Sequence, residues 1–209
     1  MKIGIIGAGH IGATAARLFV AAGHEVALSN SRGPQTLGDV AAGIGVHAHA
    51  ATVEDAAKFG DVVLVAIPFG KFKTLAAEAF AGKIVIDADN YYPQRDGHFA
   101  ELDTNLTTSS ELLAAHLKGA RVVKAFNTIY YEHLAQQGNT ALPLGQRRAI
   151  FLAGDDAEAR QVVADLIEQI GFGPVDMGSL GEGGRLQQPG TSVYNREVNV
   201  EEAQEILER

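Results

Sequence analysis

Short apolar runs alternate with stretches of helical periodicity from one end of the chain to the other. The run at residues 61–68 is almost wholly apolar and too short to be a helix, and shorter apolar stretches lie within residues 2–6, 83–87 and 121–124. Such runs are typical of strands that are buried on both faces. The alternation predicts a parallel sheet with helices on both sides. Helix starts are expected at Thr52, Thr108 and Asn199, where the residue three positions later is acidic.

The first apolar run leads into three glycines at the spacing of a dinucleotide-binding loop. Gly7 permits a tight turn, Gly9 lets backbone N–H groups approach a pyrophosphate, and Gly12 lets the next helix lie close to the strand. The positive end of that helix favours phosphate. An ordinary turn without ligand is the alternative. The strand and helix on either side are those of a Rossmann fold, so we expect the cofactor to be bound by Gly7, Ala8, Gly9, His10, Ile11 and Gly12.

The end of the second predicted strand indicates which dinucleotide is bound. An NAD site would place an Asp or Glu there, about 20 residues beyond the loop, to bind the ribose 2′-hydroxyl. This chain has Ser29, Asn30, Ser31 and Arg32 instead. Their hydroxyl, amide and guanidinium donors suit a 2′-phosphate, which a carboxylate would repel. The segment therefore favours NADP(H), and a plain polar turn is the alternative.

In an open parallel sheet the ligand lies beyond the carboxyl ends of the strands. We therefore expect Ala66, Ile67 and Pro68 to lie beside the nicotinamide ring. The polar run at residues 87–93, which includes Asn90, is a candidate wall of the site. Turn formation by the Asx residues and coverage of the core by the tyrosines are the alternatives for this run.

Lys124 and Asn127 leave the sixth predicted strand as a polar pair. We expect them to be the catalytic residues, in the sense that they meet the nicotinamide carboxamide or the hydride acceptor. A lysine with a purely structural role at a strand edge is the alternative.

Composition narrows the possible partners. The chain of 209 residues is 46% hydrophobic with a formal net charge of −8, which argues against nucleic-acid or anionic-membrane binding. No apolar stretch approaches the roughly 20 residues that span a bilayer, and the first residues enter a core strand without a leader. The chain has no cysteine, and His47 and His49 lack a third ligand, so no metal is expected. These features predict a cytoplasmic protein with a small-molecule partner.

Glycine, asparagine and proline interrupt the periodicity at residues 136–146, where we place a boundary. Residues 1–140 are then an NADP-binding Rossmann domain. Residues 141–209 are a small C-terminal α/β segment, with strands at 149–152 and 173–177 around a helix, and a closing helix from Val200.

Five segments together carry a resemblance: GIIGAGHIGATAARLFVAAGHEVALSNSRGP, DVVLVAIPFG, VIDADNYYP, VVKAFNTI and GRLQQPGTSVYN. They resemble the NADPH-dependent reductases of the F420H2:NADP oxidoreductase family over nearly the whole chain. KAFNT is also similar to the cytosolic domain of the six-transmembrane metalloreductases. The resemblance implies that the C-terminal segment completes an acceptor pocket and that hydride passes between nicotinamide C4 and C5 of a deazaflavin.

The same resemblance implies roles for individual residues. It assigns residues 7–12 to the pyrophosphate, Ser31 and Arg32 to the 2′-phosphate, Ile67 and Pro68 to the nicotinamide, Lys124 and Asn127 to the acceptor, and Arg185, Gln188 and Pro189 to the pocket rim or a dimer contact. Dimerisation through the helix at Val200 is expected by analogy.

Three other functions stay open at this point. The acceptor can be FMN, FAD or another small molecule instead of coenzyme F420. A non-catalytic NADP-binding sensor would keep the glycines and Arg32 without any turnover. The β-hydroxyacid dehydrogenases and imine reductases share the nucleotide signals but need a long all-helical C-terminal domain, which the predicted strand pair does not match.

Overall fold

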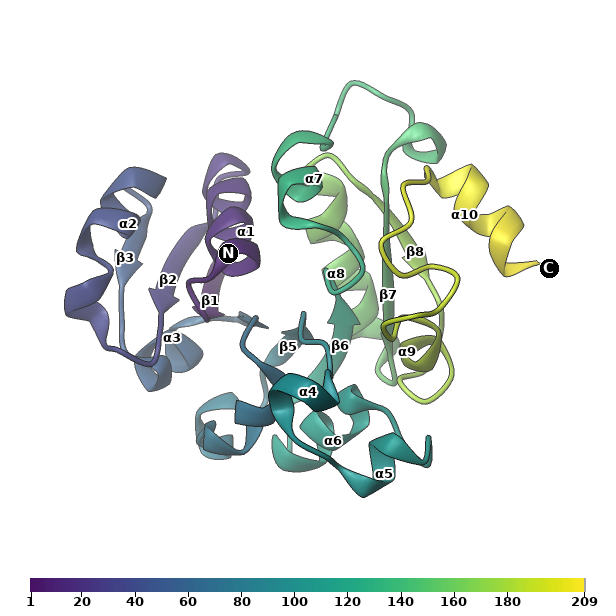
Figure 1. The fold of residues 1–209 in the computed structure, drawn as a ribbon. Helices are drawn as coiled ribbons and strands as arrows, with labels where there is room; N and C mark the ends of the chain where they lie inside the picture. The colour runs from purple at the N-terminus through teal and green to yellow at the C-terminus, as the bar shows by residue number, and fades with distance from the viewer. Residues whose placement is uncertain (209) are drawn as a thin grey trace.

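Eight strands form one sheet in the computed structural model, which describes residues 1–208 (Figure 1). Their order across the sheet is β3-β2-β1-β4-β5-β6-β7-β8, and the first six pair in parallel in the Rossmann order. The doubly wound α/β fold that the sequence predicts is confirmed. The strands are β1 Lys2–Ile6, β2 Glu25–Ser29, β3 Ala48–Ala50, β4 Val62–Val65, β5 Ile84–Asp87, β6 Arg121–Ala125, β7 Ala149–Gly154 and β8 Gly173–Asp176.

The pairing of β7 corrects the prediction of a wholly parallel sheet, because β7 runs antiparallel to β6. The intervening helix α7 (Tyr131–Gln136) has six residues. It is about 9 Å long, and the connection that contains it does not return to the start of β6, because Ala125 pairs with Leu152. The chain therefore enters β7 beside the carboxyl end of β6. β7 and β8 then pair in parallel across α8 (Ala157–Gln169), which confirms the β-α-β unit predicted for this part of the chain.

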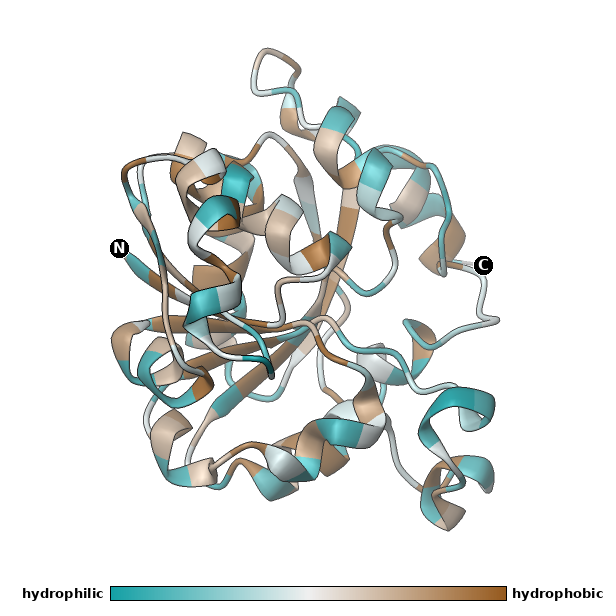
Figure 2. Cartoon of the chain, turned by 60° about the vertical axis from the view of Figure 1, so that its left-hand side comes forward, coloured by the Kyte–Doolittle hydropathy of each residue, from teal (hydrophilic) through white to brown (hydrophobic). Residues whose placement is uncertain are grey.

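Helices cover both faces of the sheet (Figure 1). α1 (His10–Ala21) and α8 bury apolar residues on one face, and α3 (Val53–Phe59) and α6 (Ser109–His116) do so on the other. Successive strand residues alternate between the two cores. Figure 2 shows the resulting distribution, with hydrophobic strands inside and hydrophilic positions on the outer helix surfaces. The remaining helices are α2 Gly38–Ile44, α4 Pro93–Asp96, α5 Ala100–Asp103, α9 Gly183–Leu186 and α10 Val200–Leu207, with 3₁₀ turns η1 Pro34–Thr36, η2 Phe69–Thr74, η3 Ala77–Phe80 and η4 Leu144–Gln146.

The predicted helix starts are confirmed. The side chains of Thr108 and Asn199 accept hydrogen bonds from the backbone N–H at the third helical position. The Glu side chain at that position accepts one in turn from the backbone N–H of the cap residue. Thr52 caps α3 by accepting from the Asp55 N–H at 3.1 Å. Such caps satisfy N–H groups that the helix leaves unpaired. None of the helices within residues 1–208 is long and apolar enough to cross a membrane.

The sheet continues across the predicted boundary at residue 140, because β6 on one side pairs with β7 on the other. The segment after β8 crosses back over the carboxyl ends of the strands through α9 before it reaches α10. It lies beside the loop that follows β6: the N–H of Asn195 donates to the Thr128 carbonyl oxygen at 3.1 Å. The last part of the chain is thereby placed at the edge of the sheet where a ligand is expected.

Candidate active site

The loop between β1 and α1 has the geometry that its three glycines predict. Gly7 has a φ of 109°, which side chains rarely adopt, and a Cβ there would lie 2.2 Å from the Ala66 carbonyl oxygen. A Cβ at Gly12 would lie 1.8 Å from the Gly7 carbonyl oxygen, so glycine allows α1 to begin this close to β1. At Gly9 a Cβ would meet no atom of the described residues within 4 Å. Gly9 therefore leaves an open cradle above the loop.

The N-terminus of α1 is available for an anion. In the described structure no side chain caps this helix, and its first turn contains no acidic residue. Its first N–H groups are therefore unpaired, and the helix dipole adds positive potential at the same place. Together with the open cradle at Gly9, this end fits a pyrophosphate.

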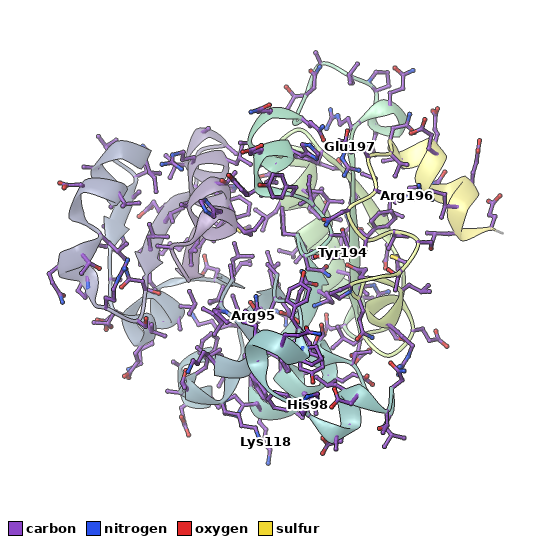
Figure 3. All side chains as sticks on the ribbon, viewed as in Figure 1. Arg95, His98, Lys118, Tyr194, Arg196 and Glu197 are labelled. Carbon is purple, nitrogen blue, oxygen red and sulfur yellow. The ribbon has the colours of Figure 1, made fainter. Side chains whose placement is uncertain are left out.

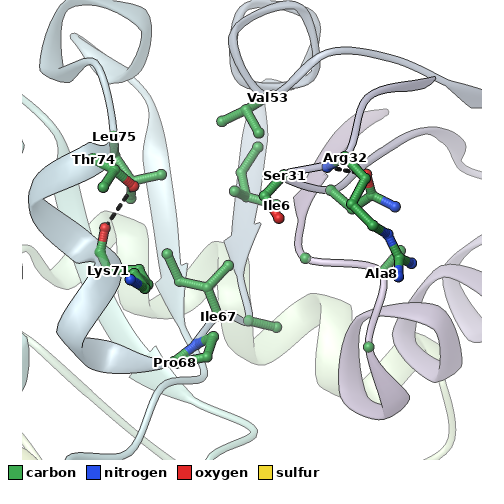
Figure 4. Close-up of a pocket in the computed structure, with 14 residues that line it drawn as sticks. Ile6, Ala8, Ser31, Arg32, Val53, Ile67, Pro68, Lys71, Thr74 and Leu75 are labelled. Carbon is green, nitrogen blue, oxygen red and sulfur yellow. Dashed lines mark hydrogen bonds between the residues drawn. The ribbon is translucent and has the colours of Figure 1, made fainter. Parts of the chain in front are cut away.

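A cavity of about 760 Å³ opens beside the loop, and we call it the loop cavity. Figure 4 shows Ser31 and Arg32 on one wall and Lys71 and Thr74 on the other, with Ile67 between them. Its volume lies in the range of small-molecule sites, about 300–1,000 Å³. Of the predicted cofactor residues, those that line it are Gly7, Ala8, Gly9, Asn30, Ser31, Arg32, Ala66, Ile67 and Pro68.

The charge of the loop cavity is positive. Arg32 and Lys71 line it, and no carboxylate is among its described lining residues. Asn30 shapes the turn beneath Arg32, because its Oδ1 accepts from the Arg32 N–H at 2.8 Å. Ser29 is placed elsewhere than expected: it is buried in β2, and its hydroxyl donates to the Ile5 carbonyl oxygen at 2.9 Å. The predicted 2′-phosphate donors therefore reduce to Asn30, Ser31 and Arg32.

Sequence reasoning missed Lys71. It lies on η2, the 3₁₀ turn that follows Pro68, where no motif marks a cofactor contact. The signal that could have found it is its position a few residues beyond the carboxyl end of β4, the strand next to β1.

A second cavity of about 510 Å³ lies on the other side of Pro68, and we call it the tyrosine cavity. It is named for Tyr92, Tyr130, Tyr131 and Tyr194, which line it. The two cavities share Gly9, Ala66, Ile67 and Pro68. These residues follow β1 and β4, where the strand order reverses, which is the position of ligands in such sheets. From the predicted set the tyrosine cavity also includes His10, Ile11, Asn90 and Asn127.

Aromatic rings give the tyrosine cavity its character. The His10 ring stacks on Tyr131 with the ring centroids 4.2 Å apart. Arg95 lies over the Tyr92 ring, with its guanidinium carbon 4.9 Å from the centroid, and is paired with Asp96 at 2.9 Å. The charge of Arg95 is therefore neutralised by Asp96, and aromatic ring faces make up much of the lining of the tyrosine cavity. Tyr92 follows the carboxyl end of β5, and Tyr130 and Tyr131 follow that of β6, each within about six residues of its strand.

Asn127 connects two of the predicted motifs, KAFNT at residues 124–128 and GRLQQPGTSVYN at residues 184–195. Its Nδ2 donates to the Gln187 carbonyl oxygen at 2.7 Å and to Asn90 Oδ1 at 3.1 Å. The Asn90 Nδ2 in turn donates to the Asn127 carbonyl oxygen at 2.9 Å. These bonds fix the C-terminal segment against the floor of the tyrosine cavity. Arg185 is turned away from it and donates to the Asn105 carbonyl oxygen at 2.9 Å.

Lys124 is in a different place from the one the sequence suggested. Its side chain is 1% exposed and lines neither cavity in the described structure. Its Nζ lies 3.2 Å from Asp87 Oδ2 and 2.7 Å from the Asp89 carbonyl oxygen. The reason is the register, because Lys124 and Asp87 are direct neighbours on adjacent strands. The Lys124 ammonium group therefore lies beneath the site and is not part of the lining that a ligand would contact.

Asp89 connects this ion pair to the predicted nicotinamide wall. Its Oδ1 accepts from the Ile67 N–H at 2.7 Å, and its own N–H donates to Asp87 Oδ1 at 2.9 Å. Burial, and then the charge of Asp87, raise the pKa of Asp89 well above its usual range. The carboxyl group under Ile67 is thus protonated more readily than an exposed aspartate.

Comparisons with known proteins agree with this geometry. A structure of hypothetical protein SMa0349 from Sinorhizobium meliloti is 33% identical, with a TM-score of 0.83 and 95% of each chain covered. The family described as NADP oxidoreductase coenzyme F420-dependent matches residues 2–91. An F420-dependent NADP reductase from Methanocaldococcus jannaschii is 33% identical over 61% of this chain and 57% of its own. The family match at residues 2–91 therefore covers every residue that lines the loop cavity.

The chain is also similar to part of a larger protein. Metalloreductase STEAP3 of Rattus norvegicus is 31% identical over 86% of this chain. The chain spans about a third of the length of that protein, 34%. The family resemblance that the sequence motifs indicate is confirmed.

Proposed function

We propose that this protein is an NADP(H)-dependent oxidoreductase that passes hydride between NADPH and a planar ring acceptor, a deazaflavin such as coenzyme F420 or a flavin. The observation that carries the proposal is the meeting of two chemically different cavities at Gly9 and residues 66–68. One end is cationic and the other is aromatic. A cofactor that lies across the junction has its phosphates at one end and its reactive ring at the other.

The residues of the loop cavity bind the phosphate groups of the cofactor and discriminate NADP(H) from NAD(H). The cradle at Gly9 and the N-terminus of α1 take the pyrophosphate. Arg32, with Ser31 beside it, takes the 2′-phosphate, and Lys71 adds positive charge from the opposite wall. Because this protein carries a formal net charge of −8, local cations are required to attract so anionic a ligand.

The residues of the tyrosine cavity orient the rings and exclude water. Ile67 and Pro68 form one wall beside the nicotinamide, and Asp89 holds Ile67 from below. When bound, NADPH supplies the hydride from its nicotinamide C4. Transfer between two stacked rings depends on orientation and on the exclusion of water more than on a strong acid or base.

One relative supports a deazaflavin acceptor, because the methanocaldococcal protein is described as F420-dependent. The rat protein is described as a metalloreductase, a name that specifies no ring acceptor. A flavin reductase, which the sequence left open, is the second candidate. A non-catalytic NADP sensor would have no use for a tyrosine-lined cavity beside the nicotinamide wall.

The test is NADPH oxidation by the purified protein, followed by the loss of near-ultraviolet absorbance, with F420, FMN, FAD and riboflavin offered separately and NADH as the control donor. Turnover with F420 alone assigns a deazaflavin reductase, and turnover with FMN or FAD assigns a flavin reductase. NADPH binding without turnover by any acceptor contradicts the proposal. The cytoplasmic location and the homodimer both stay predictions. Light scattering can test the oligomeric state.

A further inference from the structure

Two tyrosines that are distant in sequence meet at the tyrosine cavity. Tyr92 precedes α4, and Tyr194 lies on the C-terminal segment; Figure 3 shows Tyr194 on that segment near Arg95 of α4. Their hydroxyl groups are hydrogen-bonded to each other across 102 positions of sequence. Both residues line the cavity that we assign to the hydride acceptor.

The hydrogen bond between the two hydroxyls leaves one of their O–H protons free to be donated elsewhere. Two phenol groups carry two O–H protons, and the bond between them uses one. The Asn195 side chain also reaches the Tyr194 hydroxyl, but it lowers the pKa of that group as a donor does, so it takes up no tyrosine proton. Burial, followed by the bond to Tyr92, raises the pKa of Tyr194, so its hydroxyl stays protonated. The pair is therefore a donor of one hydrogen bond.

Further contacts hold the Tyr92 ring and the backbone that carries Tyr194. Arg95 lies over Tyr92 and donates to the Asn90 carbonyl oxygen at 2.6 Å. Tyr194 is fixed from its own backbone, because its N–H donates to the Thr191 carbonyl oxygen at 3.3 Å and the next N–H, that of Asn195, donates to Thr128. Donors that are fixed before the reaction stabilise developing charge without reorganisation.

We propose that the Tyr92 and Tyr194 hydroxyl pair donates a hydrogen bond to the acceptor ring at the atom where negative charge develops. The inference rests on the proposed function. A hydride brings two electrons and one proton, so the acceptor gains one negative charge until a solvent proton neutralises it. The tyrosine protons stay on the tyrosines. The pair thus selects acceptors whose ring conjugates the hydride-accepting atom to a carbonyl oxygen or a ring nitrogen.

The test compares Tyr92→Phe, Tyr194→Phe and the double variant with Tyr91→Phe as the matched control. The Tyr91 hydroxyl lies outside the cavity, 2.7 Å from its acceptor Asp103 Oδ1 and 3.1 Å from the Gly97 carbonyl oxygen. For each variant, kcat and KM are measured with the acceptor that the wild-type protein reduces, and the Kd of NADPH is measured by its fluorescence.

We expect kcat to fall by about tenfold or more in the double variant, since one preorganised donor contributes about 10²–10³ at a fully enclosed oxyanion site. Each single variant keeps one phenol O–H at the cavity, so its loss of kcat should be no larger than that of the double variant. The Kd of NADPH and the control variant should be unchanged. An active wild-type protein with an unchanged kcat in the double variant overturns this inference alone, whereas a wild-type protein that reduces no acceptor overturns the proposed function with it.

Discussion

Lys124 Nζ lies 3.2 Å from Asp87 Oδ2, and both side chains are buried, with 1% and 0% exposure. The Ser110 hydroxyl donates to the same Asp87 oxygen at 2.6 Å. Through the N–H and carbonyl oxygen of Asp89, the pair holds the residue that supports Ile67. A buried ion pair in the sheet is thereby connected to the wall of the proposed nicotinamide site.

Replacing Lys124 tests this structural role. In Lys124→Met the Asp87 carboxylate is left buried without its partner, and we expect a loss of about 3–5 kcal/mol in the free energy of unfolding. Adding Asp87→Asn should recover part of that loss, because the uncompensated charge is removed. Urea denaturation measures both, with the exposed Lys118→Met as control. If Lys124→Met unfolds like the wild type, the ion pair does not stabilise this edge of the sheet.

The second and third glycines of the loop should respond differently to alanine. Gly9→Ala adds a Cβ in open space, so the protein should fold with wild-type stability but bind NADPH at least about tenfold more weakly, because the cradle is filled. Gly12→Ala places a Cβ 1.8 Å from the Gly7 carbonyl oxygen and should destabilise the fold itself. Thermal unfolding and NADPH titration distinguish the two. Equal effects of both substitutions would contradict the separate roles.

Arg32 should determine the preference for the phosphorylated cofactor. Arg32→Ala removes a charged hydrogen-bond donor, which is worth about 1.5–3 kcal/mol, so the affinity for NADPH should fall by about 10- to 100-fold. The affinity for NADH should hardly change. The surface variant Arg17→Ala, on α1 but outside both cavities, is the control. Equal losses for NADPH and NADH would place the 2′-phosphate away from Arg32.

Asp89→Asn should change how stability depends on pH. Because the pKa of Asp89 is raised in the folded protein, the folded state keeps a proton that the unfolded chain releases near its ordinary pKa of 3.8. The wild-type protein therefore loses stability as the pH rises from about 4 toward the folded pKa. The amide has no proton to lose, so the variant should gain stability relative to the wild type over that interval. Urea unfolding at several pH values measures the difference, and a difference that does not change with pH would show that Asp89 is ionised in the fold.

Much of this architecture is readable in the sequence because it is local. The glycine spacing, the apolar runs and the caps at Thr108 and Asn199 each involve residues within a few positions of one another. Backbone sterics and helix-end hydrogen bonds act over that distance. The nucleotide loop and Arg32 could therefore be placed before any coordinates.

The parts that could not be read depend on which distant segments meet. Lys124 and Asp87 pair because their strands are in register, which the polarity of either residue does not reveal. Tyr194 reaches Tyr92 only because the C-terminal segment crosses the strand ends. The antiparallel pairing of β7 with β6 depends on where the chain returns to the sheet after α7. A helical pattern in the sequence shows that a helix is present but does not fix where it ends.

The most direct test of the account follows the hydride itself. NADPH deuterated at one or the other C4 position is mixed with the protein and a 5-deazaflavin acceptor, whose accepting atom is a carbon and retains the label. Mass spectrometry of the reduced acceptor should find one deuterium from only one of the two labelled cofactors, because the walls at Ile67 and Pro68 leave one nicotinamide face open to the tyrosine cavity. Bound NADPH with an unreduced acceptor, or a reduced acceptor that carries no label from either cofactor, would contradict it.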